Sequence, residues 1–193
     1  MHVREVNAEF KRTILLVSYE ALESEGFTRY RKEDVDRPIN ESFHCWVGLN
    51  TGLYADHVAI SPFVGVHSPP IMKLAAQLEG WKYNRGDATY AIHMGEIAPD
   101  ENAFQFTRST DIAAEAKRLA KLYASVGLSY SQSIAGYSTL LPLLEERTPM
   151  LGGYPQSVAC CLYLMGRIDD AQRYASTLLP NRYLASFAAA FLE

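Results

Sequence analysis

Residues 43–70 read FHCWVGLNTGLYADHVAISPFVGVHSPP and hold two runs with the two-residue period of a β-strand. In residues 43–49 every second side chain is apolar, which places these side chains on one face of a strand. Residues 57–66 alternate in the same way. The Asn-Thr-Gly sequence at 50–52 supplies turn chemistry between the runs, because Asn and Gly tolerate positive φ. The segment therefore predicts an antiparallel hairpin with its turn at residues 50–52.

Proline interrupts the second run at position 62. Because proline has no N–H for a sheet ladder, we expect this strand to lie at an edge of the sheet or to carry a bulge there. His44, Trp46 and Phe63 make the second face of the hairpin partly apolar. That face is either packed under helices or offered to a partner, and the burial of Trp46 is expected to distinguish the two.

Helical periodicity dominates the rest of the chain. Apolar residues at spacings of three and four predict a helix over residues 3–25, which Gly26 ends. Ser68 and the two prolines after it predict a helix through Leu78. Further strands are expected at 27–32, 89–97 and 103–106, with a charged turn at 33–41. A helix is expected from a Ser109 or Thr110 cap to Gly127, and another at 130–147 with a kink or division at Pro142. The last helices are expected at 155–165, 169–179 and 181–192.

Together these elements predict an α+β fold. It has an N-terminal helix, a four- to five-stranded antiparallel sheet with one intervening helix, and a helical C-terminal half. No low-complexity linker separates the parts, so residues 1–193 are expected to form one domain. Within it, residues 1–107 hold the helix and the sheet, and residues 108–193 form a helical subdomain packed on them.

Composition limits the function classes. The chain has 193 residues, of which 48% are hydrophobic and 21% charged, as in a compact globular protein. Its formal net charge of -4 gives no long-range attraction for nucleic acid, which needs clustered Lys and Arg. The first residues are charged where a signal peptide is apolar, and no apolar run reaches the roughly 18 residues of a membrane span. We therefore expect a cytoplasmic protein that binds neither nucleic acid nor membrane.

Candidates for chemistry are few. The histidines at 44, 57, 67 and 93 are the set that could serve a metal or a general base, but no metal-ligand spacing accompanies them. Cys45 and His44 are adjacent in a strand and so point to opposite faces. Cys160 and Cys161 lie in an apolar helical segment, which would raise a thiol pKa. With no phosphate-binding glycine motif either, we predict no catalytic, cofactor-binding or metal-binding residue and no cofactor.

One local pattern is similar to a helical repeat. Residues 158–175 resemble the helical hairpin of a tetratricopeptide repeat, in which the small side chains of Gly166 and Ala171 would let two helices approach closely. A single copy is visible, whereas such repeats need neighbours to bury their faces. An ordinary helical hairpin is the favoured interpretation.

The order of elements carries a broader resemblance. A leading helix that closes with Gly26-Phe27-Thr28-Arg29, strands at 43–49 and 62–66, and helices that end in residues 166–171 resemble small bacterial immunity proteins of polymorphic toxin systems, including contact-dependent growth inhibition. The resemblance implies a non-enzymatic cytosolic protein that binds and neutralises a cognate toxin domain, often a nuclease. It carries no site residue over to this chain.

A cationic nuclease would be complemented by acidic loops, which speed association. We expect the partner-binding residues to be Glu33, Asp34, Asp36 and Glu41 before the hairpin, Trp46 within it, and Glu96, Asp100 and Glu101 after the third long strand. Two alternatives stay open: a small hydrolase or metal-dependent enzyme that uses His44, His57, His67 and His93, and a peptide-binding scaffold formed by residues 108–193. Monomer and dimer are both compatible with the sequence.

Overall fold

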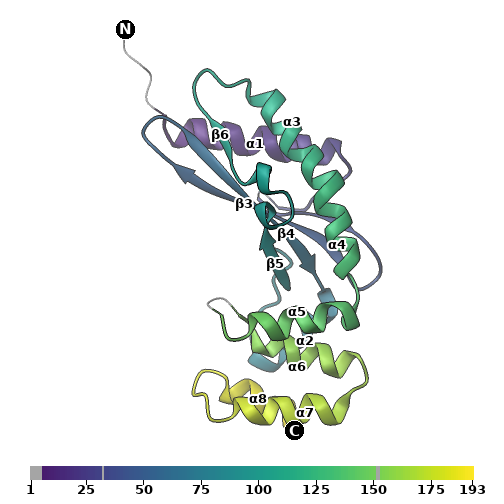
Figure 1. Cartoon of the computed structure of the whole chain (residues 1–193). Coiled ribbons are helices and arrows are strands. Elements are labelled where there is room, and N and C mark those ends of the chain that lie inside the picture. The colour runs from purple at the N-terminus through teal and green to yellow at the C-terminus, as the bar shows by residue number, and fades with distance from the viewer. Residues whose placement is uncertain (1–5, 32, 151–152) are drawn as a thin grey trace. The chain divides into compact units, whose positions relative to one another are not determined.

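The computed structural model describes residues 6–31, 33–150 and 153–193 and confirms the predicted α+β class (Figure 1). The chain divides into two compact units. Unit 1 comprises residues up to 38, 45–65 and 91–132, and unit 2 comprises residues 39–44, 66–90 and 133–193. Residues 108–132 thus belong with the sheet in unit 1, which differs from the predicted boundary after residue 107. The single-domain arrangement stays a prediction.

The first helix, α1, spans Ala8–Ser24. It begins after Asn7, whose side chain accepts a hydrogen bond from the Phe10 N–H, and Gly26 follows its end with φ +89°, as predicted. The predicted start at Val3 lies outside the described residues. Its buried stripe runs at four-residue spacing through Phe10, Ile14, Ser18 and Leu22, rather than through the predicted Val17 and Ala21.

The described strands form one six-stranded sheet in the order β1-β2-β3-β4-β5, with β6 paired to β4. One more strand is present than predicted, because the expected charged turn at 33–41 contains β2. Asp36 and Val35 of β2 pair with Thr28 and Arg29 of β1. The bounds are β1 Thr28–Arg29, β2 Val35–Pro38, β3 His44–Leu53, β4 Val58–His67, β5 Tyr90–His93 and β6 Phe104–Phe106.

The predicted hairpin is confirmed as β3 and β4, but its predicted turn at 50–52 is wrong. These residues continue β3, and the loop closes at residues 54–57, where the Tyr54 N–H donates to the His57 carbonyl over 2.9 Å. The Tyr54 and His57 rings also stack, 4.5 Å apart. Gly52 does not form the turn. It leaves room for the Tyr54 ring, since a Cβ there would lie 2.7 Å from Tyr54 Cε2.

Pro62 does not mark an edge strand, since β4 has β3 on one side and β6 and β5 on the other. Residues 58–60 of β4 pair with β6, and the Val66 carbonyl accepts from the Thr89 N–H next to β5. The missing N–H of Pro62 therefore falls where the partner of β4 changes from β6 to β5. A proline is tolerated in a sheet where no ladder bond is required of it.

The helix after the sheet is continuous through Gly127, which was predicted to end it. Helix α3, Ile112–Leu122, passes into a π-helical turn, Tyr123–Gly127, and then into α4, Leu128–Ile134. The cap is Asp111, which accepts from the Ala114 N–H, instead of Ser109 or Thr110. In Figure 1, α3 crosses α1, against which it packs.

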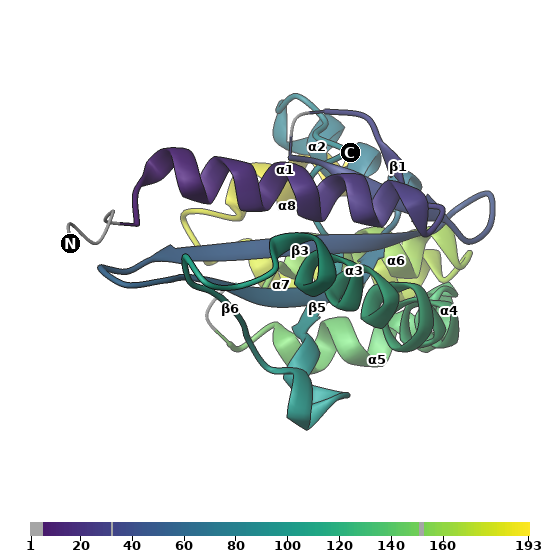
Figure 2. The ribbon, with the colours of Figure 1, turned by 90° about the horizontal axis from the view of Figure 1, so that it is seen from above.

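Three residues at four-residue spacing dock this helix on the hairpin. The Tyr123 hydroxyl lies 3.0 Å from the carbonyl oxygens of both Gly48 and Phe63, and Ser131 donates to the Gly65 carbonyl over 2.8 Å. Between them, Gly127 lies close to the sheet, since a Cβ there would be 3.2 Å from Val64 Cγ2 and Met94 Cε. Figure 2 shows α1 beside β3, where Lys11 donates to the Thr51 carbonyl.

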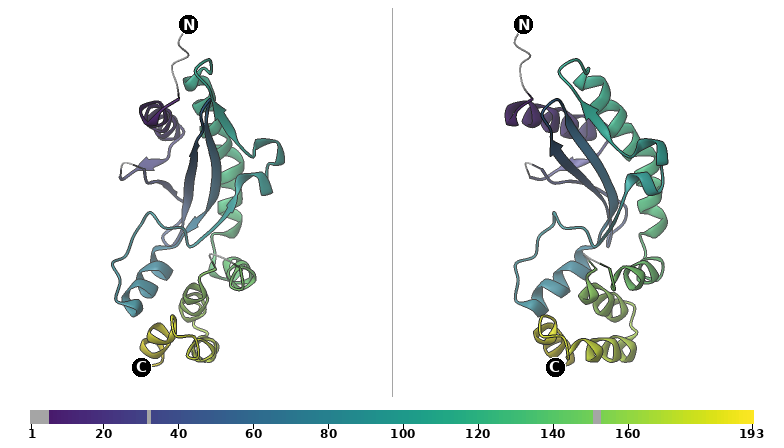
Figure 3. Two further views of the ribbon diagram at one scale, coloured as in Figure 1. Left: turned by 90° about the vertical axis from the view of Figure 1, so that its left-hand side faces the viewer. Right: turned by 60° about the vertical axis from the view of Figure 1, so that its left-hand side comes forward.

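Unit 2 is mainly helical. Consecutive helices α5 to α8 pack in chain order, and α2 packs against α6 and α8 (Figure 3). The predicted 130–147 helix divides at Ala135–Gly136, while Pro142 lies inside α5. Gly166 ends α6 with φ +75° and open space around it, so it does not serve close packing. The bounds are α2 Pro69–Glu79, α5 Tyr137–Arg147, α6 Pro155–Leu164, α7 Ile168–Leu178 and α8 Ala185–Leu192. No helix among the described residues is long and apolar enough to cross a membrane.

Replacing Tyr123 with phenylalanine should destabilise unit 1. The side chain is 0% exposed, so the variant removes a buried hydroxyl that donates to the Gly48 and Phe63 carbonyls. We expect Tyr123→Phe to lower the free energy of unfolding by about 1–3 kcal/mol in urea titrations. Tyr54→Phe makes the same chemical change at an exposed position and should have little effect. Equal midpoints for the two variants would contradict this role.

Candidate functional site

The four predicted histidines do not converge. His57 lies in the hairpin turn, with Nδ1 2.7 Å from Asp56 Oδ1. His93 caps the short 3-10 helix Met94–Glu96 by accepting from the Gly95 N–H. His44 and His67 are neighbours, with ring centroids 6.2 Å apart. The described residues contain no group of three or more His, Cys, Asp or Glu side chains that could hold a metal ion.

The cysteines are buried thiols. Burial raises the pKa of Cys45 to about 11 and the pKa values of Cys160 and Cys161 to about 12. The predicted direction for Cys160 and Cys161 is therefore confirmed. Because the thiolate is the reactive form, these side chains stay protonated and unreactive near neutral pH.

The predicted acidic residues have different structural roles. Asp36 is 0% exposed in β2, so the expectation that it lies in a charged turn open to a partner is wrong. Asp34 pairs with Arg31 at 3.7 Å, and Glu101 pairs with Arg118. Glu96 accepts from the His93 N–H and completes a capping box. The exposed members of the set are Glu33, Glu41, Glu96 and Asp100.

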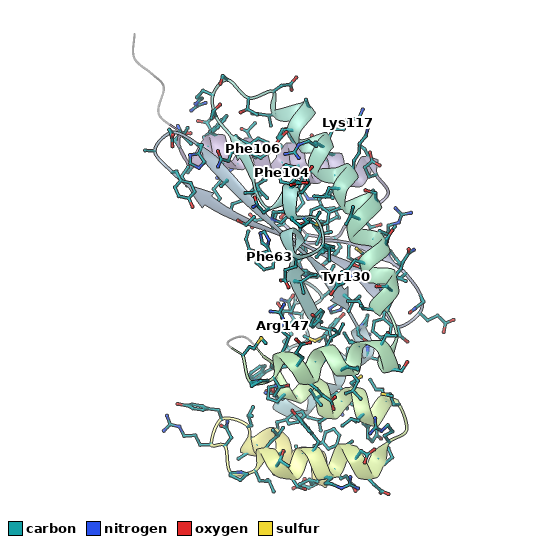
Figure 4. The ribbon with its side chains drawn as sticks, viewed as in Figure 1. Phe63, Phe104, Phe106, Lys117, Tyr130 and Arg147 are labelled. Atoms are coloured by element: carbon teal, nitrogen blue, oxygen red, sulfur yellow. The ribbon has the colours of Figure 1, made fainter. Side chains whose placement is uncertain are left out.

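Trp46, the aromatic member of the predicted site, is half-buried. Its ring covers Gly48, where a Cβ would lie 2.4 Å from Trp46 Cη2 and 3.2 Å from Phe63 Cβ. Figure 4 places Phe63 at the middle of the sheet. The second face of the hairpin is thus filled in part by its own side chains, so the burial of Trp46 does not separate a covered face from a partner-binding one.

The most exposed tryptophan, Trp81, was missed by sequence reasoning. It follows directly after Gly80, which ends α2 in the left-handed conformation, and its N–H donates to the Ala76 carbonyl over 2.8 Å. The backbone of Trp81 is therefore fixed by the helix cap. Its side chain is nevertheless 64% exposed. A large aromatic residue just after a helix-ending glycine, in a polar loop, is the signal that could have identified it.

The loop after Trp81 is held to the end of β4 by side chains. Because a carbonyl only accepts, His67 Nδ1 is the donor to the Asp87 carbonyl at 2.7 Å. In the neutral imidazole, Nε2 then accepts from the Tyr83 hydroxyl, also at 2.7 Å. Thr89 Oγ1 accepts from the Ser68 N–H over 2.8 Å. Ser68 therefore orders this loop through its backbone, whereas its side chain makes no cap hydrogen bond to α2.

Beside Trp81 lies a hollow of about 300 Å³ within unit 2. Its apolar lining comes from α2 and from the residues that flank the loop, and it also carries one cation and one carboxylate. We call the hollow and its lining the Trp81 surface. The lining residues are Met72, Ala76, Trp81, Lys82, Asn84, Asp87, Ala88 and Tyr154.

Glu79 stabilises this surface through hydrogen bonds to its carboxylate. Its carboxylate accepts hydrogen bonds from the Tyr154 hydroxyl and, over 2.7 Å, from Gln156 Nε2. Burial and the hydrogen bond to Glu79 raise the pKa of Tyr154, so its hydroxyl stays a donor. The start of α6 is thereby tied to the end of α2, and the aromatic wall of the hollow is fixed. The arrangement offers a preformed apolar and aromatic contact surface, and its described residues include no group of His, Cys, Asp or Glu side chains that could hold a metal ion.

Comparisons of the chain with family models, with curated proteins and with solved structures found no match.

Removing the Tyr83 hydroxyl should loosen the loop. Tyr83→Phe removes the hydrogen bond from Tyr83 to His67 Nε2, and we expect the free energy of unfolding to fall by about 1 kcal/mol. Amide hydrogen exchange of residues 81–89 should quicken more than exchange in α2. Tyr163→Phe in the same unit, at an exposed side chain, is the matched control. Unchanged exchange in the loop would show that this hydrogen bond does not hold it.

Proposed function

We propose that the protein binds a partner protein through the Trp81 surface and acts as an immunity protein. The observation that carries the proposal is an exposed tryptophan whose backbone and loop are fixed before any partner arrives. Tryptophan is enriched among the residues that contribute most to binding at protein interfaces. A fixed contact loop also loses less conformational entropy on binding.

The distribution of reactive side chains supports binding over catalysis. The four histidines do not gather in one group, since His57 lies in a turn, His93 caps a 3-10 helix and His67 anchors a loop, and the thiols are buried and protonated. In this proposal the protein needs no cofactor, and binds neither nucleic acid nor membrane. Its cellular site of action is the cytoplasm, where a toxin that enters the cell must be neutralised.

The resemblance to immunity proteins specifies the partner. The proposed partner is a cognate toxin domain, in the first instance a nuclease, whose active site or neighbouring surface is covered in the complex. The exposed carboxylates Glu33, Glu41 and Asp100 would speed association with a cationic nuclease without contributing most of the affinity. The Trp81 surface would supply the slow dissociation, because desolvated aromatic contacts lie at the centre of tight interfaces.

Co-expression with the toxin-like product of the adjacent gene tests this function. The wild-type protein should restore growth and co-purify with the toxin domain. Trp81→Ala should weaken the complex by at least about 2 kcal/mol, or roughly 30-fold in the Kd from calorimetry. Tyr183→Ala removes another exposed aromatic ring of unit 2, 76% exposed, and should leave the Kd unchanged.

The results distinguish a wrong function from a wrong binding surface. If no complex forms and growth is not restored, the immunity function is wrong. If the wild type and both variants bind equally, the function stands but the Trp81 surface is not where the toxin binds.

A further inference from the structure

A second hollow, of about 240 Å³, lies in unit 1 along α1 and shares no residue with the Trp81 surface. One wall is the outer side of α1, and the other is formed by Arg29 of β1 and Glu33 of the loop after it. We call this hollow the α1 groove. Neither the fold nor the proposed function accounts for it.

The α1 wall is a stripe distinct from the buried one. Ala8, Arg12, Leu15, Leu16 and Tyr19 follow one another at helical spacing on a single face. Leu16 is 47% exposed, whereas the Tyr19 ring is buried and forms the floor. Leu16 and the neighbouring Tyr19 ring therefore form an apolar surface. An apolar side chain of a partner could pack on this surface.

The rim of the groove is cationic. Lys11, Arg12 and Arg29 face a single carboxylate, Glu33, so the groove reverses the sign of a chain whose net charge is -4. The Arg29 guanidinium lies 4.9 Å from the centre of the Tyr19 ring, and Arg29 Nε donates to the Arg31 carbonyl over 3.2 Å, so its position is set. Arg12 is exposed and has no ion-pair or hydrogen-bond partner among the described residues.

Tyr19 adds a neutral hydroxyl at the floor of the groove. Burial raises the pKa of Tyr19 to about 12, with Glu33 and Asp34 acting in the same direction and Arg29 in the opposite one. The hydroxyl is therefore protonated at neutral pH and can donate a hydrogen bond to an incoming carboxylate, as the charged rim also does.

We infer that the α1 groove binds an acidic amphipathic segment of a partner protein, with carboxylates at Arg12 and Arg29 and an apolar side chain over Leu16. Charge complementarity selects the acidic segment, and the aliphatic stripe selects an amphipathic one. A nucleic acid fits less well, because phosphate binding needs a denser set of cations than three side chains with a carboxylate among them.

Two synthetic peptides of about four helical turns test this inference without any toxin. Both carry leucines on one face, and the remaining positions are glutamates in one peptide and lysines in the other. Fluorescence anisotropy with the full chain should show the acidic peptide binding at least about tenfold more tightly than the basic one. The difference should shrink as salt rises, because the Debye length falls from about 30 Å at 0.01 M to about 8 Å at 0.15 M.

Variants locate the binding. Arg12→Glu and Leu16→Asp should each weaken binding of the acidic peptide at least about tenfold. Lys117→Glu is the matched control for the charge reversal, since this exposed lysine lies on α3 outside the groove (Figure 4). It should change the Kd less than about twofold, as should Trp81→Ala. Unchanged thermal midpoints establish that the variants are folded. If Leu16→Asp does not fold, Arg12→Glu, which changes an exposed side chain, decides the result.

Several results would overturn the inference. Equal binding of the two peptides, or equal weakening by Lys117→Glu and Arg12→Glu, would mean that no groove specific for acidic segments exists. A single-stranded oligonucleotide that binds more tightly than the acidic peptide would assign the cations to phosphate. Self-association that Leu16→Asp abolishes, in sedimentation at rising protein concentration, would make a second copy of the chain the occupant.

Discussion

The hydrogen bonds from the Tyr123 hydroxyl to Gly48 and Phe63 are the constraint on which unit 1 depends. They join the long helix after the sheet to both strands of the hairpin at once. Burial raises the pKa of Tyr123 well above its ordinary value, so the hydroxyl stays a donor. Its ring also meets Phe27 edge-on, 6.5 Å away, which brings the segment after α1 against the same side chain. One buried phenol thus links elements that are far apart in sequence.

Much of the fold could be predicted because alternation and helical spacing are local signals. The β3–β4 hairpin, α1 and the last three helices follow from them. The turn at 54–57 and strand β2 could not be predicted in this way. They depend on the stacking of Tyr54 on His57 and on the pairing of β1 with β2, and no local residue pattern indicates these contacts. Gly127 differs from its prediction for a similar reason: the sequence suggests a helix stop, whereas the glycine lies inside the helix, close to Val64.

The candidate site was harder to predict than the fold. The acidic residues are expected on loops that a cationic partner could reach, yet Asp36 is buried within a strand and Glu101 is paired with Arg118. Sequence reasoning also singled out Trp46, whose ring covers Gly48, and overlooked Trp81. What distinguishes the two tryptophans is the neighbouring structure: a glycine beneath one ring, and a helix end behind the other. The glycine beneath Trp46 is known only once the chain is folded, whereas the helix-ending Gly80 before Trp81 is a local signal in the sequence.

The π-helical turn at Tyr123–Gly127 has a consequence for how this chain tolerates insertions and deletions. A π-turn differs from an α-turn by one additional residue. Deleting one residue there would restore regular α-helical spacing and bring Tyr123 and Ser131 about two α-helical turns apart. Both side chains would then stay on the helix face that meets the hairpin, where Ser131 now reaches the Gly65 carbonyl. The wide turn is therefore the place where this helix could lose one residue and keep both contacts with the sheet.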